Sequence, residues 1–159
     1  MSPILHGIQS HDQHAFTPLI RIEDALLCAE SVIEYSLEFH MPIWLLSLDL
    51  RKAFDTINHD RLFEALESCG VELPYISLLK LLYVGQSVSV HEGREFDILR
   101  GVKQGDVLSA ILFNCVLDLV FRNWKRRLST EGILVDSSID RLTNTRYTNE
   151  ILVHRKSLE

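Results

Sequence analysis

The chain has 159 residues, of which 47% are hydrophobic and 24% charged, which suits one domain with a sizeable core and argues against a disordered chain. Its formal net charge of -6 argues against tight, sequence-independent binding to a polyanion, because such binding needs clustered Lys and Arg to neutralise phosphates. A nucleic-acid function would therefore depend on local basic patches.

The cysteines and the apolar segments indicate an intracellular protein, nuclear or cytoplasmic, without a membrane partner. Cys28, Cys69 and Cys115 lie far apart without metal-ligand spacing, so we expect reduced core residues. Residues 1–16 lack the basic start and the continuous apolar run of a signal peptide. The most hydrophobic run, residues 107–121, is interrupted by Asn114 and Asp118 and is shorter than the roughly 20 residues that span a bilayer, so we expect a buried helix.

The first predicted elements are a helix and a strand. Residues 22–39 predict the helix, because apolar residues recur at helical spacing and Pro42 follows the segment. Residues 43–50 form a continuous apolar run between polar neighbours, which predicts a strand buried on both faces. Asp49, near the end of this run, is the one residue that a buried strand does not explain.

Two helices are expected next. The first begins near Asn58, which suits a helix cap, and ends at Gly70, which permits a left-handed stop. The second begins at Pro74, a good residue for a first helical turn, and ends at Gly85. Together they fill the interval between the first strand and the alternating segment that follows.

The second half of the chain predicts two hairpins and a long helix. Residues 87–102 alternate around Glu92-Gly93, which predicts a β-hairpin. Asp106 can cap a helix that runs to about Leu128, and short β-like segments follow at 133–135, 141–147 and 150–154. The fold class is therefore α+β: a small antiparallel sheet with helices packed on one face, in a single domain over residues 1–159.

Asp49 and the turn after it are the first candidates for chemistry. A charged carboxylate at the end of a buried strand is strongly destabilising when unpaired, so hydrogen bonds, a cation or a metal ion must compensate it. Backbone amides could satisfy Asp49 as well as a metal ion could. Phe54 is either a core anchor or an aromatic wall for a sugar or base, and Asp55 is either a cap or part of the same site.

A second candidate is Gln104-Gly105-Asp106, between a strand and a helix N-terminus. Free backbone N–H groups and the missing side chain of Gly105 let a ligand approach closely. A capped turn explains the same residues equally well.

Three segments, in this order, resemble the palm of a reverse transcriptase: "SLDLRKAFD", "RGVKQGDVLSAILFN" and "RLTNTRYTNEILV". They are most similar to the non-LTR (LINE-like) retrotransposon group and its group II intron relatives. The family's tyrosine-alanine-aspartate-aspartate turn is matched here by Tyr147-Thr148-Asn149-Glu150, and an upstream family element by Gln13, Phe16, Pro18 and Asp24. The resemblance covers the chain from Gln13 onward.

This resemblance implies an RNA-directed DNA polymerase, a nucleotidyltransferase that uses a template-primer of RNA or DNA, dNTPs and two divalent ions, Mg²⁺ or Mn²⁺. It places Asp49, Asn149 and Glu150 at catalytic positions, with Asp49 and Glu150 as metal ligands. Arg100, Lys103 and residues 125–127 are implied phosphate contacts, or else a solvated face. The implied substrate-binding residues are Leu50, Arg51, Lys52 and Ala53 at the triphosphate, Phe54 against the ribose 2′-hydroxyl, Gln104 and Gly105 at the template base or incoming nucleotide, and Tyr147.

Departures from the family pattern predict impaired catalysis. Asn149 offers a neutral carbonyl oxygen where the family has a carboxylate ligand, and Glu150 is one methylene longer than aspartate. Misplacement of about 1 Å can lower a rate roughly 10²-fold. The finger strands and the thumb are missing, so we expect a partial domain, with a remnant of the fingers and the palm, that other chains could complete.

Two alternatives stay open from the sequence. One is a non-catalytic palm-like remnant, or a module kept for protein or nucleic-acid contact. The other is an unrelated α+β binding domain, which predicts that Asp49 and Glu150 do not lie at neighbouring strand ends.

Overall fold

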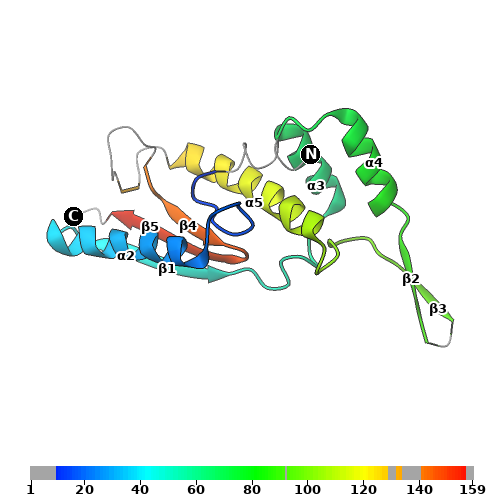
Figure 1. Cartoon of the computed structure of the whole chain (residues 1–159), viewed down its shortest axis with the longest axis horizontal. Coiled ribbons are helices and arrows are strands. Elements are labelled where there is room, and N and C mark those ends of the chain that lie inside the picture. Colours follow the sequence, from blue (N-terminus) through cyan, green and yellow to red (C-terminus); the bar gives the residue numbers. More distant parts are fainter. Residues whose placement is uncertain (1–9, 92, 129–131, 134–140, 157–159) are drawn as a thin grey trace. The chain divides into compact units, whose positions relative to one another are not determined.

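The computed structural model describes residues 10–91, 93–128, 132–133 and 141–156. The chain forms two compact units. Among the described residues, unit 1 comprises residues 52–119, and unit 2 comprises residues 10–51 together with those from 120 onward (Figure 1). The two units contain different parts of the predicted site.

Unit 2 contains a three-stranded antiparallel sheet in the order β1 (Ile43–Asp49), β5 (Glu150–Lys156), β4 (Asn144–Tyr147). The two-residue turn Thr148-Asn149 joins β4 to β5, as the sequence predicts for this hairpin. The register pairs Glu150 with Asp49 on one side and with Tyr147 on the other. The sheet therefore collects these side chains at one end.

Two helices cover opposite faces of this sheet, so the prediction that helices pack on one face was wrong. On one face, Cys28 of α2 (Ile22–Glu38) lies with its Sγ 3.4 Å from Thr145 Oγ1. On the other, the Arg146 guanidinium lies 4.6 Å from the ring centre of Phe121, in the second half of α5 (Val107–Arg127). Consecutive residues of a strand point to opposite faces, so α2 and this part of α5 enclose β4 between them.

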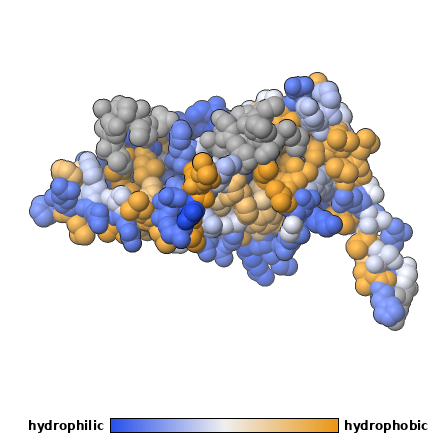
Figure 2. All heavy atoms as spheres, viewed as in Figure 1, coloured by the Kyte–Doolittle hydropathy of each residue, from blue (hydrophilic) through white to orange (hydrophobic). Residues whose placement is uncertain are grey.

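β1 is an exposed edge strand, so the prediction of a strand buried on both faces was also wrong. Trp44 is 70% exposed and Leu46 56% exposed, and the strand has only one neighbour in the sheet among the described residues. An apolar run in the sequence predicts a hydrophobic strand, but it does not predict which elements of the fold cover that strand. Figure 2 shows hydrophobic side chains on the surface over α2 and over α4 (Leu73–Tyr83) as well.

Unit 1 packs α3 (His59–Ser68), α4 and the first half of α5 around a core that includes Leu62, Leu66, Ile76 and Leu112. The predicted cap of α3 is confirmed, because Asn58 Oδ1 accepts a hydrogen bond from the Arg61 N–H at 3.1 Å. The predicted hairpin is formed by β2 (Ser87–Val90) and β3 (Arg94–Asp97), and Glu92 of its turn lies outside the described residues.

The long helix α5 begins directly after its predicted cap, since the Leu108 N–H donates to Asp106 Oδ1 at 3.0 Å. With 21 residues it is long and apolar enough to span a bilayer by length and composition, which the shorter run in the sequence did not suggest. However, 56% of its most apolar window is buried inside the protein, as in a core helix.

Two smaller predictions concern the cysteines and the last β-like segments. Cys69 and Cys115 are buried and Cys28 is half-buried, and none of the three forms a disulfide. Ile133 forms an isolated bridge with Leu142, and residues 134–135 lie outside the described residues.

Candidate nucleotidyl-transfer site

The β4–β5 turn brings Asn149 and Glu150 to the end of β1, beside Asp49. Asn149 Nδ2 donates a hydrogen bond to Asp49 Oδ1 at 2.5 Å, and the Leu50 N–H donates to the Asn149 carbonyl at 3.0 Å. Leu50 and Asn149 therefore form a hydrogen-bonded pair. The adjacent pair, Asp49 and Glu150, is a non-hydrogen-bonded pair, the kind in which side chains of neighbouring strands lie closest. The three predicted catalytic positions thus form one cluster.

The charges of this cluster are unbalanced. Asp49 and Glu150 lie directly opposite each other, an arrangement that disfavours like charges by about 0.2–1 kcal/mol. Both side chains are exposed, and in the described part of the chain neither has a cationic partner. Within the same residues, no group of three or more His, Cys, Asp or Glu is arranged to hold a metal ion. The role of Asp49 and Glu150 as metal ligands stays a prediction.

The turn itself is strained. Thr148 has a φ of +56°, a conformation that is disfavoured for a β-branched residue. Such strain is often found where a turn must present its side chains in a fixed direction. In this chain, that direction is toward Asp49.

Tyr147 and Glu150 also border a cavity of about 250 Å³ between α2 and the sheet. The walls come from apolar residues of α2, among them Ala25 and Leu26, and from Leu152 of β5. Tyr147 is half-buried here, so its ring lies against the helix side of the sheet near the cluster.

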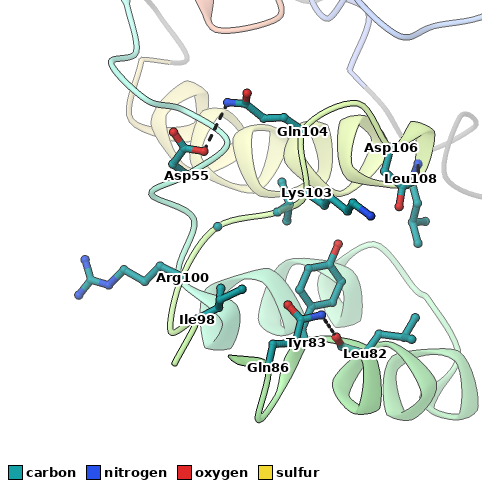
Figure 3. Close-up of a pocket in the computed structure, with 12 residues that line it drawn as sticks. Asp55, Leu82, Tyr83, Gln86, Ile98, Arg100, Lys103, Gln104, Asp106 and Leu108 are labelled. Atoms are coloured by element: carbon teal, nitrogen blue, oxygen red, sulfur yellow. Dashed lines mark hydrogen bonds between the residues drawn. The ribbon is translucent and has the colours of Figure 1, made fainter. Parts of the chain in front are cut away.

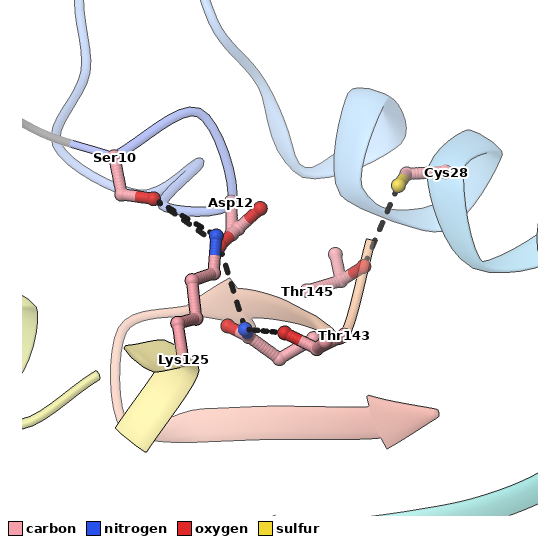
Figure 4. Close-up of polar contacts among 7 residues, drawn as sticks. Ser10, Asp12, Cys28, Lys125, Thr143 and Thr145 are labelled. Carbon is pink, nitrogen blue, oxygen red and sulfur yellow. Dashed lines mark hydrogen bonds and ion pairs between the residues drawn. The ribbon is translucent and has the colours of Figure 1, made fainter. Parts of the chain in front are cut away.

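A network of buried polar groups joins β4 to residues 10–12 and to Lys125 of α5 (Figure 4). Lys125 pairs with the carboxylate of Asp12, which is 6% exposed and also accepts from Asn144 Nδ2 at 3.4 Å. The segment around Asp12 is also bonded to β4 through the backbone: the Arg146 N–H donates to the Asp12 carbonyl at 2.8 Å. Lys125 was expected to contact phosphate or lie on a solvated face, but it is instead largely committed to this ion pair.

Two histidines near the network have lowered pKa values. Burial disfavours the charged form of His154, which is 1% exposed, and so lowers its pKa from the ordinary value of 6.5, while Asp12 partly opposes the shift. Burial also lowers the pKa of His14 for the same reason. Both rings are therefore neutral near pH 7.

In unit 1, backbone hydrogen bonds join residues 54–57 to residues 101–102 along a contact that we call the seam. The Val102 N–H donates to the Phe54 carbonyl and the Gly101 N–H to the Ile57 carbonyl, both at 2.8 Å. Further along, Gln104 Nε2 donates to Asp55 Oδ1 at 3.3 Å (Figure 3). The seam fixes Gln104 relative to Phe54.

Two residues to which the sequence assigned no role, Phe113 and His59, support this seam. The Phe54 ring stacks on Phe113 of α5, with ring centres 4.7 Å apart and planes 23° apart. His59 Nε2 lies 2.9 Å from the Gly101 carbonyl. Their partners are distant in the sequence, so neither periodicity nor composition could have revealed them.

A cavity of about 590 Å³ opens beside the seam (Figure 3). Its lining includes Tyr83, Lys103 and Gln104. Arg100 also borders it, although its guanidinium extends away from the other labelled side chains in Figure 3. The predicted phosphate contacts Arg100 and Lys103 thus lie at one cavity.

The predicted site residues fall into two sets. Unit 2 contains Asp49, Leu50, Arg51, Tyr147, Asn149 and Glu150, and unit 1 contains Lys52, Ala53, Phe54, Gln104 and Gly105. Each set is clustered within its own unit, and their roles stay predictions.

Comparison with known proteins identifies the family. The family described as reverse transcriptase (RNA-dependent DNA polymerase) matches residues 1–159, so the chain belongs to the reverse transcriptase family. Its mixed helices and small antiparallel sheets agree with an α+β domain of that family. An unrelated α+β domain is thereby excluded.

The similar proteins come from retrotransposable elements and from introns. The Pol polyprotein of the type-2 retrotransposable element R2DM of Drosophila melanogaster is 32% identical over 114 residues, which cover 69% of this chain and 11% of the polyprotein. The Pol polyprotein of the type-1 element R2 of Popillia japonica is 39% identical over 79 residues, covering 46% of this chain and 11% of that protein. The COX1/OXI3 intron 1 protein of Saccharomyces cerevisiae is 33% identical over 101 residues, covering 61% and 11%. The chain thus spans about a tenth of the length of the curated relatives it matches, and the predicted kinship with non-LTR elements and group II introns is confirmed.

Proposed function

We propose that the chain is the palm, with a remnant of the fingers, of a reverse transcriptase whose nucleotidyl transfer is impaired. The observation that carries the proposal is the hydrogen bond from Asn149 Nδ2 to Asp49 Oδ1 at 2.5 Å. This bond supports a hairpin that has the position of a catalytic turn. The Asn149 amide, however, donates to the Asp49 oxygen that would otherwise be open to a metal ion.

The donor set at the turn does not fit two divalent ions. Mg²⁺ and Mn²⁺ take oxygen ligands, and two-metal sites need carboxylates that bridge or surround both ions. Here two carboxylates are present, and the third group directs N–H rather than oxygen toward Asp49. The proposed function therefore assigns no metal-dependent step to this turn.

The substrate side of the proposal is supported by the seam in unit 1. The bonds between residues 54–57 and 101–102 hold the Phe54 ring and the Gln104 amide in fixed positions. We propose that these groups contact an incoming dNTP and the template base, with Arg51, Lys52 and Ala53 near the triphosphate and Lys103 near a phosphate. Because none of the three cysteines forms a disulfide, we also propose that the chain acts inside the cell, in the nucleus or cytoplasm.

Metal titration tests the proposal most directly. We expect calorimetry to show no strong Mn²⁺ binding by the wild-type chain, and measurable binding by the double variant Asn149→Asp/Glu150→Asp, which restores short carboxylates at the turn. Asp49→Ala in the double variant is the control and should abolish the gain. Micromolar binding of two ions by the wild-type chain would overturn the impairment.

Primer extension on an RNA template with dNTPs and Mg²⁺ or Mn²⁺ tests the residual activity. We expect the wild-type chain to extend no more primer than Asp49→Ala does. Extension clearly above that control would show that the site is still a polymerase site and would contradict the proposal.

A further inference from the structure

The free edge of β1 is open to another strand. Because the Leu50 N–H points to β5, the backbone groups of Leu45, Ser47 and Asp49 point the opposite way, out of the sheet. In the described part of the chain no backbone group pairs with this edge. Edges of this kind are usually shortened, bulged or interrupted by Lys or Pro, and residues 43–49 carry none of these features.

One face of β1 carries an apolar stripe, defined by Trp44, Leu46 and Leu48. These alternate residues share a face and are 70%, 56% and 39% exposed. The register places Leu48 on the same face as Arg146, the face on which α5 covers β4. The helix therefore leaves the stripe open to solvent.

The other face of β1 ends in uncompensated negative charge. Asp49 follows Ser47 on that face and lies opposite Glu150. Asn149 contributes a neutral donor to Asp49 and leaves both charges in place. A cation placed beside Asp49 on the free edge would lie one strand spacing, about 5 Å, from Asp49 and about twice that distance from Glu150.

We propose that β1 binds an extended peptide of a partner protein, which adds a fourth strand to the sheet. The partner segment alternates apolar residues, against Trp44, Leu46 and Leu48, with polar residues, and carries a Lys or Arg opposite Asp49. Main-chain hydrogen bonds supply affinity in this mode of binding, and the side chains supply specificity. The inference rests on the proposed function in one respect, namely that no metal ion already neutralises the acidic pair.

A second copy of the chain fits the same edge less well. Two β1 strands related by a two-fold axis would pair antiparallel, and centring the pair on Leu46 would place Asp49 opposite Ile43 of the other copy. The acidic pair would remain uncompensated. Charge complementarity therefore favours a basic partner segment.

The test uses a synthetic probe designed on this register. The acetylated and amidated peptide Lys-Val-Thr-Val-Thr-Val, added antiparallel, places its lysine opposite Asp49 and its valines opposite Leu48, Leu46 and Trp44. Matched controls are the same peptide beginning with Glu, and the same peptide N-methylated at both threonines, whose N–H groups would face β1. Binding is followed by calorimetry and by amide chemical shifts of the labelled chain.

We expect the lysine peptide to bind with shifts centred on residues 43–49. The glutamate peptide should bind at least about fivefold more weakly, as for the loss of an exposed ion pair of about 1 kcal/mol, and the N-methylated peptide should not bind. Leu46→Lys should weaken binding, whereas the matched control Leu27→Lys, at an exposed residue of α2, should not. The double variant Asp49→Asn/Glu150→Gln should remove the preference for lysine.

Several results would overturn the inference: no binding, equal binding of all three peptides, or shifts away from β1. Dimerisation of the wild-type chain that Leu46→Lys abolishes would assign the edge to a second copy instead. A Mg²⁺ titration at constant ionic strength separates this inference from the proposed function. Displacement of a bound lysine peptide by Mg²⁺ would contradict the impaired metal site while leaving the peptide site established.

Discussion

Replacing Gly101 with alanine should destabilise unit 1 more than any other glycine substitution along the seam. Gly101 has a φ of +92°, and a Cβ built on it would lie 2.9 Å from the Asp55 carbonyl oxygen and 3.1 Å from the Asp55 Cα. Both atoms are backbone, so they cannot turn aside as the end of a flexible side chain could. The Gly101 N–H also donates to the Ile57 carbonyl at 2.8 Å, which keeps the two segments at this distance.

Two effects add in this variant. A positive φ disfavours alanine by about 1–2 kcal/mol, and forcing a methyl group into a closely packed site adds about 1–3 kcal/mol. We therefore expect Gly101→Ala to lower the free energy of unfolding by about 2–5 kcal/mol. This is a large share of the 5–15 kcal/mol that is typical of a folded domain.

Gly105→Ala is the matched control. Gly105 has a similar φ of +87°, but a Cβ there meets nothing within 4 Å. Both variants stiffen the unfolded chain equally, so the difference between them isolates the contact with Asp55. In urea unfolding, Gly101→Ala should be less stable than Gly105→Ala by about 1–3 kcal/mol. Equal stabilities would refute the close approach at the seam.

The other predictions concern the turn, the buried network and the aromatic stack. Thr148→Asn should stabilise the chain by roughly 1 kcal/mol and so raise the midpoint of thermal unfolding, because asparagine tolerates the φ of +56°. A lower midpoint would count against strain in the turn. The pKa of His154 is lowered in the folded state, so the unfolded chain binds more protons at low pH, and the free energy of unfolding should fall as the pH drops below 6.5. In urea unfolding, the stability of His154→Leu should depend less on pH than that of the wild-type chain. Phe113→Ala should lower the free energy of unfolding by about 3–5 kcal/mol, and Phe113→Leu by clearly less, since Phe113 is 4% exposed. Lys125→Met should destabilise by about 3–5 kcal/mol because Asp12 is left buried and unpaired, and adding Asp12→Leu should recover much of the loss; no recovery would show that the ion pair is not the reason.

Local signals predicted the elements of this fold well. The capping residue Asn58 and the stop at Gly70, with its φ of +73°, mark the limits of α3 within the expected segment. The Thr148-Asn149 turn joins β4 to β5 between the short β-like segments that the sequence predicted. Caps and turns act within a few residues, so the sequence contains what they need.

Long-range placement was predicted less well. The run around Leu46 is hydrophobic, but its exposure depends on the order of strands in the sheet. Likewise, periodicity predicts that α2 and α5 are helices without saying that they cover opposite faces of β4. For the candidate site, the family pattern placed Asp49 and Glu150 together, but no sequence signal predicted the bond between Asn149 and Asp49 or the seam at Gly101.

The hairpin turn shows how geometry and chemistry can separate in this family. The approach of Glu150 to Asp49 is set by backbone pairing between β1, β5 and β4, which does not depend on the side chain at position 149. Asparagine at this position, where the family has aspartate, leaves the register intact, and its amide donates a hydrogen bond to Asp49. The sheet therefore has no structural reason to move when residue 149 is asparagine instead of aspartate. On the proposed function, the family resemblance would outlast the reaction, and the exposed strand beside the turn would be available for another contact.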